Sequence, residues 1–112
     1  MKYAMLIHIQ PGQFESMPED EQRSVSAEYF ALADDPRAQS GAHLQGIETA
    51  TTVRVQDGQT LTTDGPYAET KEVFAGYYVF EADNLDEAIE LAARIPAARL
   101  GGAIEVRPVV EE

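Results

Sequence analysis

The segment from Thr62 to Glu72 constrains the fold more than any other part of this 112-residue sequence. It is a polar, turn-rich connection with Asp64-Gly65-Pro66 at its centre. Pro66 has its φ fixed at about −65° and lacks an N–H. It also restricts the preceding Gly65 to extended conformations or to conformations that only glycine adopts readily. An aspartate in a turn usually accepts a hydrogen bond from the N–H two residues later, which position 66 does not have. Asp64 must therefore bond further along the loop or remain free for another partner. It is the first candidate functional residue, with a purely structural turn as the alternative.

Composition and charge predict an acidic globular protein. A chain of this length with 44% hydrophobic residues can bury about two-thirds of its unfolded surface, so we predict one domain spanning residues 1–112. The net charge of −12 and eight scattered Lys and Arg residues argue against nucleic acid or an anionic membrane as partner. The absence of cysteine excludes disulfides and thiolate chemistry. No signal peptide is present and no apolar run approaches the roughly 20 residues of a membrane span, so we expect a cytoplasmic location.

The first half of the chain predicts a strand, a helix and a loop. Lys2–Ile9 is apolar on both faces, as an interior strand is. Ser16, with Glu19 three residues later, is typical of a helix N-cap, and the helix ends before Pro36. Its apolar stripe comprises Val25, Tyr29, Leu32 and Ala33. Ala38–Gly46 is interpreted as a loop that leads into the next strand.

The second half predicts a hairpin, a strand, a helix and a final strand. Asp57-Gly58 between Ile47–Gln56 and Gln59–Thr63 is a strong hairpin signal. Phe74–Ala82 has the clearest strand pattern. A second helix begins after Asn84, with a stripe of Leu85, Ala88, Ile89, Ala92 and Ile95. The last strand, Ala103–Val110, contains Pro108 and is expected at a sheet edge.

This order predicts an α+β fold in which a single antiparallel sheet carries both helices on one face. The other face would then be uncovered, and the residues expected on it are His8, Tyr77, Val79, Glu105 and Arg107. A second copy of the chain is the most economical cover for the apolar part of that face, so we expect a homodimer.

The motif at residues 63–72 resembles that of the DGPF-motif branch of the YCII-related family, with Tyr67 where phenylalanine usually stands. The resemblance continues through Ala75-Gly76-Tyr77-Tyr78, Glu81-Ala82, Leu85-Asp86-Glu87-Ala88 and Ile104-Glu105-Val106-Arg107-Pro108-Val109. It implies a ferredoxin-like βαββαβ fold that forms a dimeric α/β barrel. The biochemical role of the family is poorly defined, so the resemblance informs the fold more than the function.

The resemblance also shows where inherited chemistry is missing. In the short YCII-related proteins, a histidine in the first helix and an aspartate after the second are the proposed active pair. The matching stretches of this chain, Val25–Phe30 and Arg94-Ile95-Pro96, contain neither residue type. Of the motif, only Asp64 remains to carry acid–base chemistry.

The candidate catalytic residues are Asp64, His43 and His8. These two histidines are the only ones in the chain, and a carboxylate can hold an imidazole in the tautomer that proton transfer needs. For either histidine taken alone, the alternative is a hydrogen-bonded structural role. The candidate ligand-binding residues are Tyr67, Tyr77 and Arg107. No metal-ligand spacing, phosphate loop or dinucleotide motif occurs, so neither a metal nor a cofactor is predicted.

Two functions follow from these features. The first is a small-molecule-binding homodimer, which could be an enzyme of lyase, isomerase or hydrolase type. Its pocket is expected between the helix layer and the sheet, near Asp64, Tyr67, His43 and His8. The second is a non-catalytic interaction or regulatory module, since members of the DGPF branch are found beside or fused to sigma-factor-like regulators.

Overall fold

The computed structural model describes residues 1–68 and 70–111. Its strands are β1 (Lys2–Ile9), β2 (Ala38–His43), β3 (Thr51–Gln56), β4 (Gln59–Asp64), β5 (Val73–Glu81) and β6 (Ala103–Pro108). Its helices are α1 (Glu19–Ala33), α2 (Leu85–Ala93) and the short 3₁₀ turns η1 (Ile47–Thr49) and η2 (Pro96–Ala98). None of the described helices is both long and apolar enough to cross a membrane.

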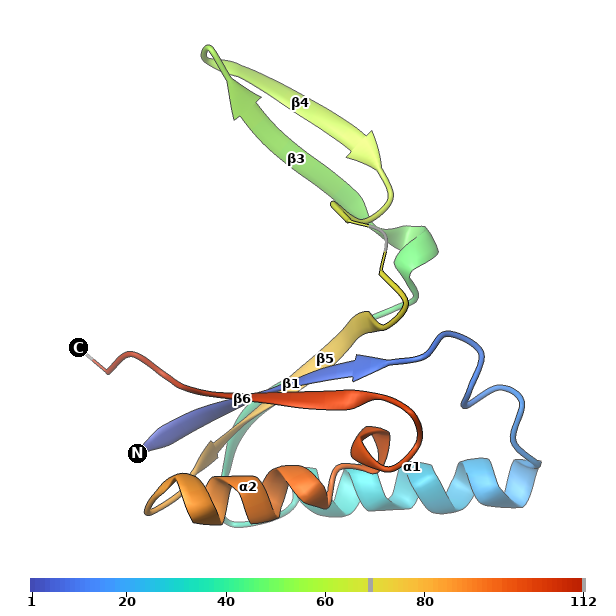
Figure 1. Cartoon of the computed structure of the whole chain (residues 1–112), viewed down its shortest axis with the longest axis vertical. Helices are drawn as coiled ribbons and strands as arrows, with labels where there is room; N and C mark the ends of the chain where they lie inside the picture. Colours follow the sequence, from blue (N-terminus) through green and yellow to red (C-terminus); the bar gives the residue numbers. More distant parts are fainter. Residues whose placement is uncertain (69, 112) are drawn as a thin grey trace.

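The main sheet has four strands in the order β2-β5-β1-β6, and every neighbouring pair is antiparallel. Both α-helices lie on one face of this sheet, and none of the described helices lies over the opposite face (Figure 1). The predicted α+β, ferredoxin-like fold with its helices on one side is confirmed. The prediction that the Pro108 strand lies at an edge is confirmed as well, since β6 ends the strand order.

The hydrophobic core lies between the sheet and the helices. Because side chains alternate along a strand, Tyr3, Met5 and Ile7 of β1 all point into this layer and are buried. The largest fully buried side chains are Phe80, Met5, Leu32, Leu91, Ile95 and Pro96. Burying each large apolar side chain contributes about 1.5–3 kcal/mol, so these few residues dominate the stability of the core.

The two helix starts differ from one another in how they are capped. At α2, Asn84 Oδ1 accepts a hydrogen bond from the N–H of Glu87 at 2.9 Å, as predicted. At α1 the predicted cap is wrong: Pro18 is the N-cap, and the hydroxyl of Ser16 donates to the carbonyl of Gln13 instead. The fixed φ of a proline suits the start of a helix without any side-chain cap.

The predicted apolar stripe of α2 is partly wrong. Ala88, Ala92 and Ile95 are buried as expected, but Leu85 and Ile89 are about half exposed. Leu91 occupies the core in their place. The buried face of the helix is therefore rotated away from the stripe that the sequence suggests.

The segment predicted as a loop, Ala38–His43, is the edge strand β2. It pairs with β5 from Ala38 opposite Phe80 to His43 opposite Gly76. Five of its six residues are exposed, so it lacks the alternation that marks a half-buried strand in a sequence. Its strand conformation is set by pairing with β5 rather than by its own residues.

Strands β3 and β4 form the predicted hairpin, but they stand outside the main sheet as a separate two-stranded sheet. The prediction of one continuous sheet is wrong on this point, because β2 takes the place beside β5. Asp57 and Gly58 have φ values of 50° and 77°, as a tight two-residue hairpin turn requires. We call residues 51–64 the arm, since they project from the body on the side away from the helices (Figure 1).

The base of the arm is closed by backbone contacts of the motif loop. The N–H of Gly65 donates to the carbonyl of Ala50 at 2.7 Å, and the Thr52 hydroxyl donates to the carbonyl of Gly65 at 2.8 Å. Gly65 has φ of +100°, a conformation that favours glycine, as the following Pro66 led us to expect.

Candidate functional site

The candidate site is the face of the main sheet that the helices leave uncovered, which we call the open face. Because Tyr3, Met5 and Ile7 point toward the helices, the residues between them point the other way. The strand register arranges the open face in three rows: Ser40, Val79, Ala4 and Arg107; Ala42, Tyr77, Leu6 and Glu105; and Phe74, His8 and Ala103. Its centre is thus apolar and aromatic, while two charged side chains line the β6 edge.

His8 stands between an aromatic ring and a carboxylate on this face. Its ring centroid lies 5.7 Å from that of Phe74, with the rings tilted by 58°. Its Nε2 lies 4.0 Å from Oε1 of Glu105, beyond hydrogen-bond length but close enough for a protonated imidazole to be attracted. The side chain of His8 is 30% exposed, so a ligand on the open face can reach it.

Glu105 connects His8 to a second charged group. Its Oε2 lies 3.9 Å from Nε of Arg107, which is 68% exposed. The carboxylate can therefore stabilise a positive imidazole on one side, while the guanidinium remains available to an anionic or carbonyl oxygen of a ligand. Beside these groups, Tyr77 and Leu6 supply an apolar surface suited to a flat organic molecule.

The structure brings together only some of the predicted site residues. His8, Tyr77 and Arg107 share the open face, as expected. His43 ends β2 and is exposed. Asp64 ends β4 opposite Thr51 and is exposed, as is Tyr67 in the following loop.

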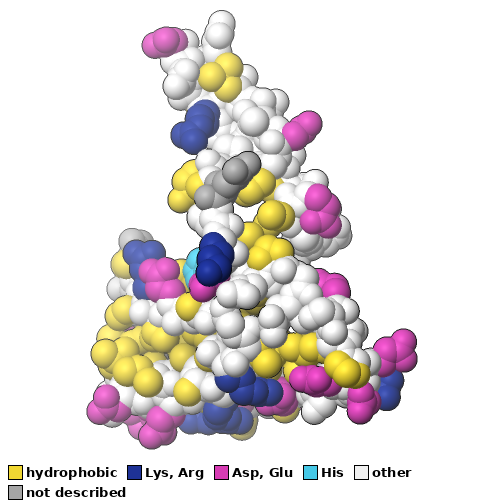
Figure 2. All heavy atoms as spheres, turned by 45° about the vertical axis from the view of Figure 1, so that its right-hand side comes forward, with side chains coloured by type: hydrophobic (Ala, Val, Ile, Leu, Met, Phe, Trp, Pro, Cys, Tyr) yellow, Lys and Arg dark blue, Asp and Glu magenta, His cyan; other side chains and the backbone are white. Residues whose placement is uncertain are grey.

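Among the described residues, no hydrogen bond or ion pair joins Asp64 to either histidine. The acidic neighbour of His8 is Glu105 instead. Sequence reasoning placed Glu105 on the uncovered face but did not pair it with His8. The pairing depends on the register of β1 with β6, in which Glu105 stands opposite Leu6, one row from His8. Figure 2 shows an exposed histidine with acidic and basic side chains beside it below the projecting arm.

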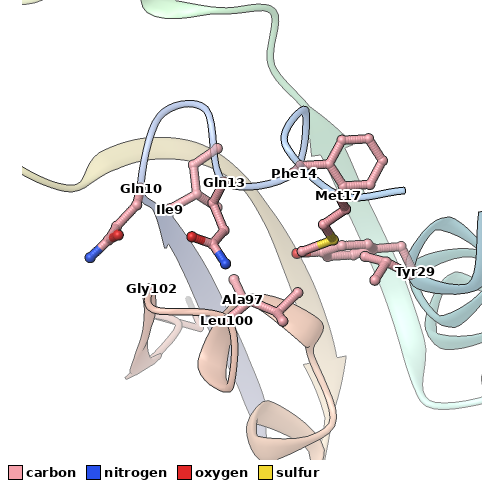
Figure 3. A pocket seen from close by; sticks show the side chains of 10 residues that line it. Ile9, Gln10, Gln13, Phe14, Met17, Tyr29, Ala97, Leu100 and Gly102 are labelled. Atoms are coloured by element: carbon pink, nitrogen blue, oxygen red, sulfur yellow. The ribbon is translucent and has the colours of Figure 1, made fainter. Parts of the chain in front are cut away.

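A separate hollow lies between the helix layer and the sheet, with about 340 Å³ of space including its open mouth. It is lined by Ile9, Gln10, Gln13, Phe14, Met17, Val25, Tyr29, Ala97, Leu100 and Gly102 (Figure 3). None of the six predicted site residues borders it. The expectation that Asp64, Tyr67, His43 and His8 surround a pocket between helices and sheet is therefore wrong.

The tyrosines near this helix layer have a structural role. The Tyr78 hydroxyl donates to the carbonyl of Tyr29 at 2.8 Å, linking β5 to α1. Burial raises the pKa of Tyr78 to about 12 and also raises that of Tyr29. Both phenols stay protonated at neutral pH, and the hydrogen bond from Tyr78 joins the sheet to the helix layer.

The helix layer and the strand order define a ferredoxin-like α+β protein, and a solved structure agrees. The chain is similar to 5-chloro-2-hydroxyhydroquinone dehydrochlorinase (TftG) from Burkholderia phenoliruptrix AC1100, in complex with 2,5-dihydroxybenzoquinone. The TM-score is 0.59 at 16% identity, covering 100% of this chain and 96% of the other. At this identity the likeness shows the fold alone.

Within this class, the chain belongs to the YCII-related family, whose domain model matches residues 1–112. It is also 36% identical over 97 residues to the uncharacterized protein R00369 of Rhizobium meliloti (strain 1021). That match covers 84% of this chain and 78% of the relative.

Proposed function

We propose that the chain is a homodimeric, small-molecule-binding protein of the DGPF-motif branch, and that its ligand lies on the open face. The observation that carries this proposal is the combination of an apolar, aromatic centre with a histidine and two charged groups at its edge. Binding sites commonly combine an apolar lining with a few polar groups of this kind. A second copy covering the face would exclude water from it.

On this proposal, each polar side chain has a distinct task. His8 accepts a proton from a ligand hydroxyl or donates one to a ligand oxygen, because an imidazole exchanges protons near neutral pH. Glu105 stabilises the imidazolium that forms. Arg107 binds an oxygen of the ligand, and Tyr77 stacks against its apolar part.

The first ligand to test is 2,5-dihydroxybenzoquinone, which is bound to the dehydrochlorinase of similar fold. A flat molecule with several oxygens suits a surface that offers one imidazole, one guanidinium and aromatic side chains. A thermal-shift screen should start with this compound and extend to other hydroxylated aromatic and carbonyl compounds, with calorimetry for each one that raises the melting temperature.

Substitution of His8 and Glu105 then tests the site. For a ligand found in the screen, His8→Gln should weaken affinity by about ten- to a hundredfold, the loss expected for a charge-assisted hydrogen bond. Glu105→Gln should weaken affinity by less, because Glu105 acts on the ligand only through its charge beside His8. Glu90→Gln removes a carboxylate from the exposed side of α2 and should leave affinity unchanged. Loss of affinity in His43→Gln but not in His8→Gln would place the site elsewhere.

The oligomeric state tests the rest of the proposal. The mass of the native protein should be about twice the 12.3 kDa of one chain by light scattering. A mass of one chain at micromolar concentration would contradict the proposed dimer.

A further inference from the structure

We propose that the arm of one copy packs against the open face of a second copy, so that each binding site is completed by the other chain. The face of the arm that makes this contact carries Val53 and Val55. This inference rests on the dimer proposed above and adds to it the element that closes the site.

Among the residues that the structure describes, the arm has no adequate packing partner in its own chain. Its two strands pair with each other, and no other described helix or strand packs extensively against them. Apart from Thr52, every residue of both strands is exposed. A two-stranded hairpin alone is marginally stable in water and needs a further strand or a packed face to persist. The arm therefore requires a surface that the described part of its own chain does not supply.

The two faces of the arm differ in the polarity of their side chains, and this difference identifies the face that contacts the second copy. The register places Thr51, Val53 and Val55 on the same face as their cross-strand partners Asp64, Thr62 and Thr60. Val53 and Val55 are 58% and 67% exposed there. The other face carries Leu61, but also Arg54 and two glutamines, and is the natural side for solvent. A pair of exposed β-branched residues flanked by threonines suits contact with an apolar sheet.

The direction of the arm brings it beside a second copy. It projects from the end of the main sheet toward the side that the helices leave open (Figure 1), and hydrophobic side chains are exposed along it (Figure 2). A second chain that covers the open face must stand in the space next to the arm. The arm thus continues the proposed interface rather than forming a separate one.

A second copy suits this surface because each chain offers both halves of the contact. Under two-fold symmetry, the arm of each copy meets the face of the other, and the contact forms twice. The arm and the open face together approach the roughly 20–30 residues per side of a standard stable interface. Asp64 shares the face of Val53 and Val55, so this contact also carries the motif aspartate toward the second chain.

The test is a pair of matched double variants of the full-length chain. Val53→Lys with Val55→Lys places two charges on the contacting face, whereas Gln59→Lys with Thr63→Lys places two on the other face of the arm. Burying unpaired charge is costly, so the first variant should raise the dimer dissociation constant at least about a hundredfold. Sedimentation should show it as a single chain of 12.3 kDa at concentrations where wild type and control are dimers. The circular dichroism of all three should agree.

The possible outcomes separate this inference from the proposed function. If both double variants stay dimeric, the arm does not hold the dimer and the inference is overturned, while a ligand-binding dimer stands. Dissociation of both variants would also overturn it, because the contact would not be specific to the Val53–Val55 face. A wild-type chain that is monomeric would overturn the dimer itself, whatever the variants show.

A cross-linking experiment locates the contact directly. The chain has no cysteine, so Val55→Cys introduces a unique attachment point for a photo-activated cross-linker. In an equal mixture of ¹⁵N-labelled and unlabelled chains, the inference predicts mixed cross-links from residue 55 to peptides containing residues 74–79 or 103–107. Cross-links confined to a single chain, or directed to the helix side of the sheet, would contradict it.

Discussion

The main sheet and the arm are both antiparallel β-structure, yet they differ in what holds them together. The main sheet is covered by two helices, and its inward side chains, such as Met5 and Phe80, are fully buried. The arm has an ideal Asp57-Gly58 turn and a regular register, but almost no burial. The residues of a tight turn are thus enough to specify a hairpin. Whether two strands join a sheet that packs on a core depends instead on which of their side chains can be buried.

The largest expected effect comes from cutting a core side chain and comparing it with one on the arm. Phe80→Ala should lower the free energy of unfolding by about 3–5 kcal/mol, because it leaves a cavity in the centre of the helix–sheet layer. Leu61→Ala, on the solvent side of the arm, should cost about 0.5 kcal/mol, as exposed sites usually do. Urea denaturation at fixed protein concentration measures both. Equal losses would mean that the arm and the core unfold as one unit.

The next largest effect on stability is expected from the ion pairs that join the end of α1 to the start of α2. Asp35 accepts hydrogen bonds from the backbone N–H of Arg37 at 2.8 Å, and from its Nε and Nη2 at 3.0 and 2.9 Å. Arg37 also reaches Oε1 of Glu87 at 3.1 Å, joining the turn after α1 to the start of α2. The Arg37 hydrogen bonds lower the pKa of Asp35 to about 2. This carboxyl is therefore harder to protonate in the folded chain than in the unfolded one.

The sign of the pH dependence follows from that lowered pKa. The contribution of Asp35 is complete above its unfolded pKa of about 3.9 and is lost as the pH falls toward about 2. Asp35→Asn should remove about 1.5–3 kcal/mol of stability at pH 7 and flatten the decline between pH 4 and 2. Asp57→Asn in the arm turn, where asparagine is equally suitable, is the matched control and should change neither. An unchanged acid profile in Asp35→Asn would assign the decline to other groups.

Much of the body of the protein could be predicted from the sequence. Strong apolar patterns gave β1, β5 and both helices, and the Asp57-Gly58 turn gave the hairpin. The exposed strand β2 could not be predicted in the same way, because the polar run from Gln39 to Gly41 carries no alternation. With residues 38–43 interpreted as a loop, the predicted single sheet has to include the two hairpin strands, which in the structure form a sheet of their own.

The candidate site was predictable to a lesser extent. Alternation along β1 and β5 was enough to assign His8 and Tyr77 to one face. The neighbour of His8 was not predictable, because it depends on the register of β6 against β1. These two strands lie far apart in the sequence, so the sequence leaves that register open. The motif around Asp64 predicts its turn conformation, but it contains no information about which distant side chains lie near the Asp64 carboxylate.

The smallest expected effect lies where the two regions join, at Pro66. This residue is exposed in the loop between the arm and β5, and the preceding Gly65 holds the base of the arm through its hydrogen bond to Ala50. Pro66→Ala should lower the free energy of unfolding by only about 0.4–1 kcal/mol, because it mainly enlarges the freedom of the unfolded chain.

Pro66→Ala also restores an N–H two residues after Asp64, and the Asp64 carboxylate can then accept a hydrogen bond from it. The double variant Pro66→Ala with Asp64→Ala lacks this acceptor. The free energy of the new hydrogen bond is measured by comparing the stability lost through Pro66→Ala in the wild type with the stability lost through Pro66→Ala in the Asp64→Ala background. A smaller loss in the wild type indicates that the hydrogen bond forms. Hydrogen exchange should accelerate at amides of residues 51–64 and stay unchanged in β1 and β5. A loss of several kcal/mol, with faster exchange throughout the main sheet, would instead show that the joint stabilises both regions and that the arm belongs to the cooperative core.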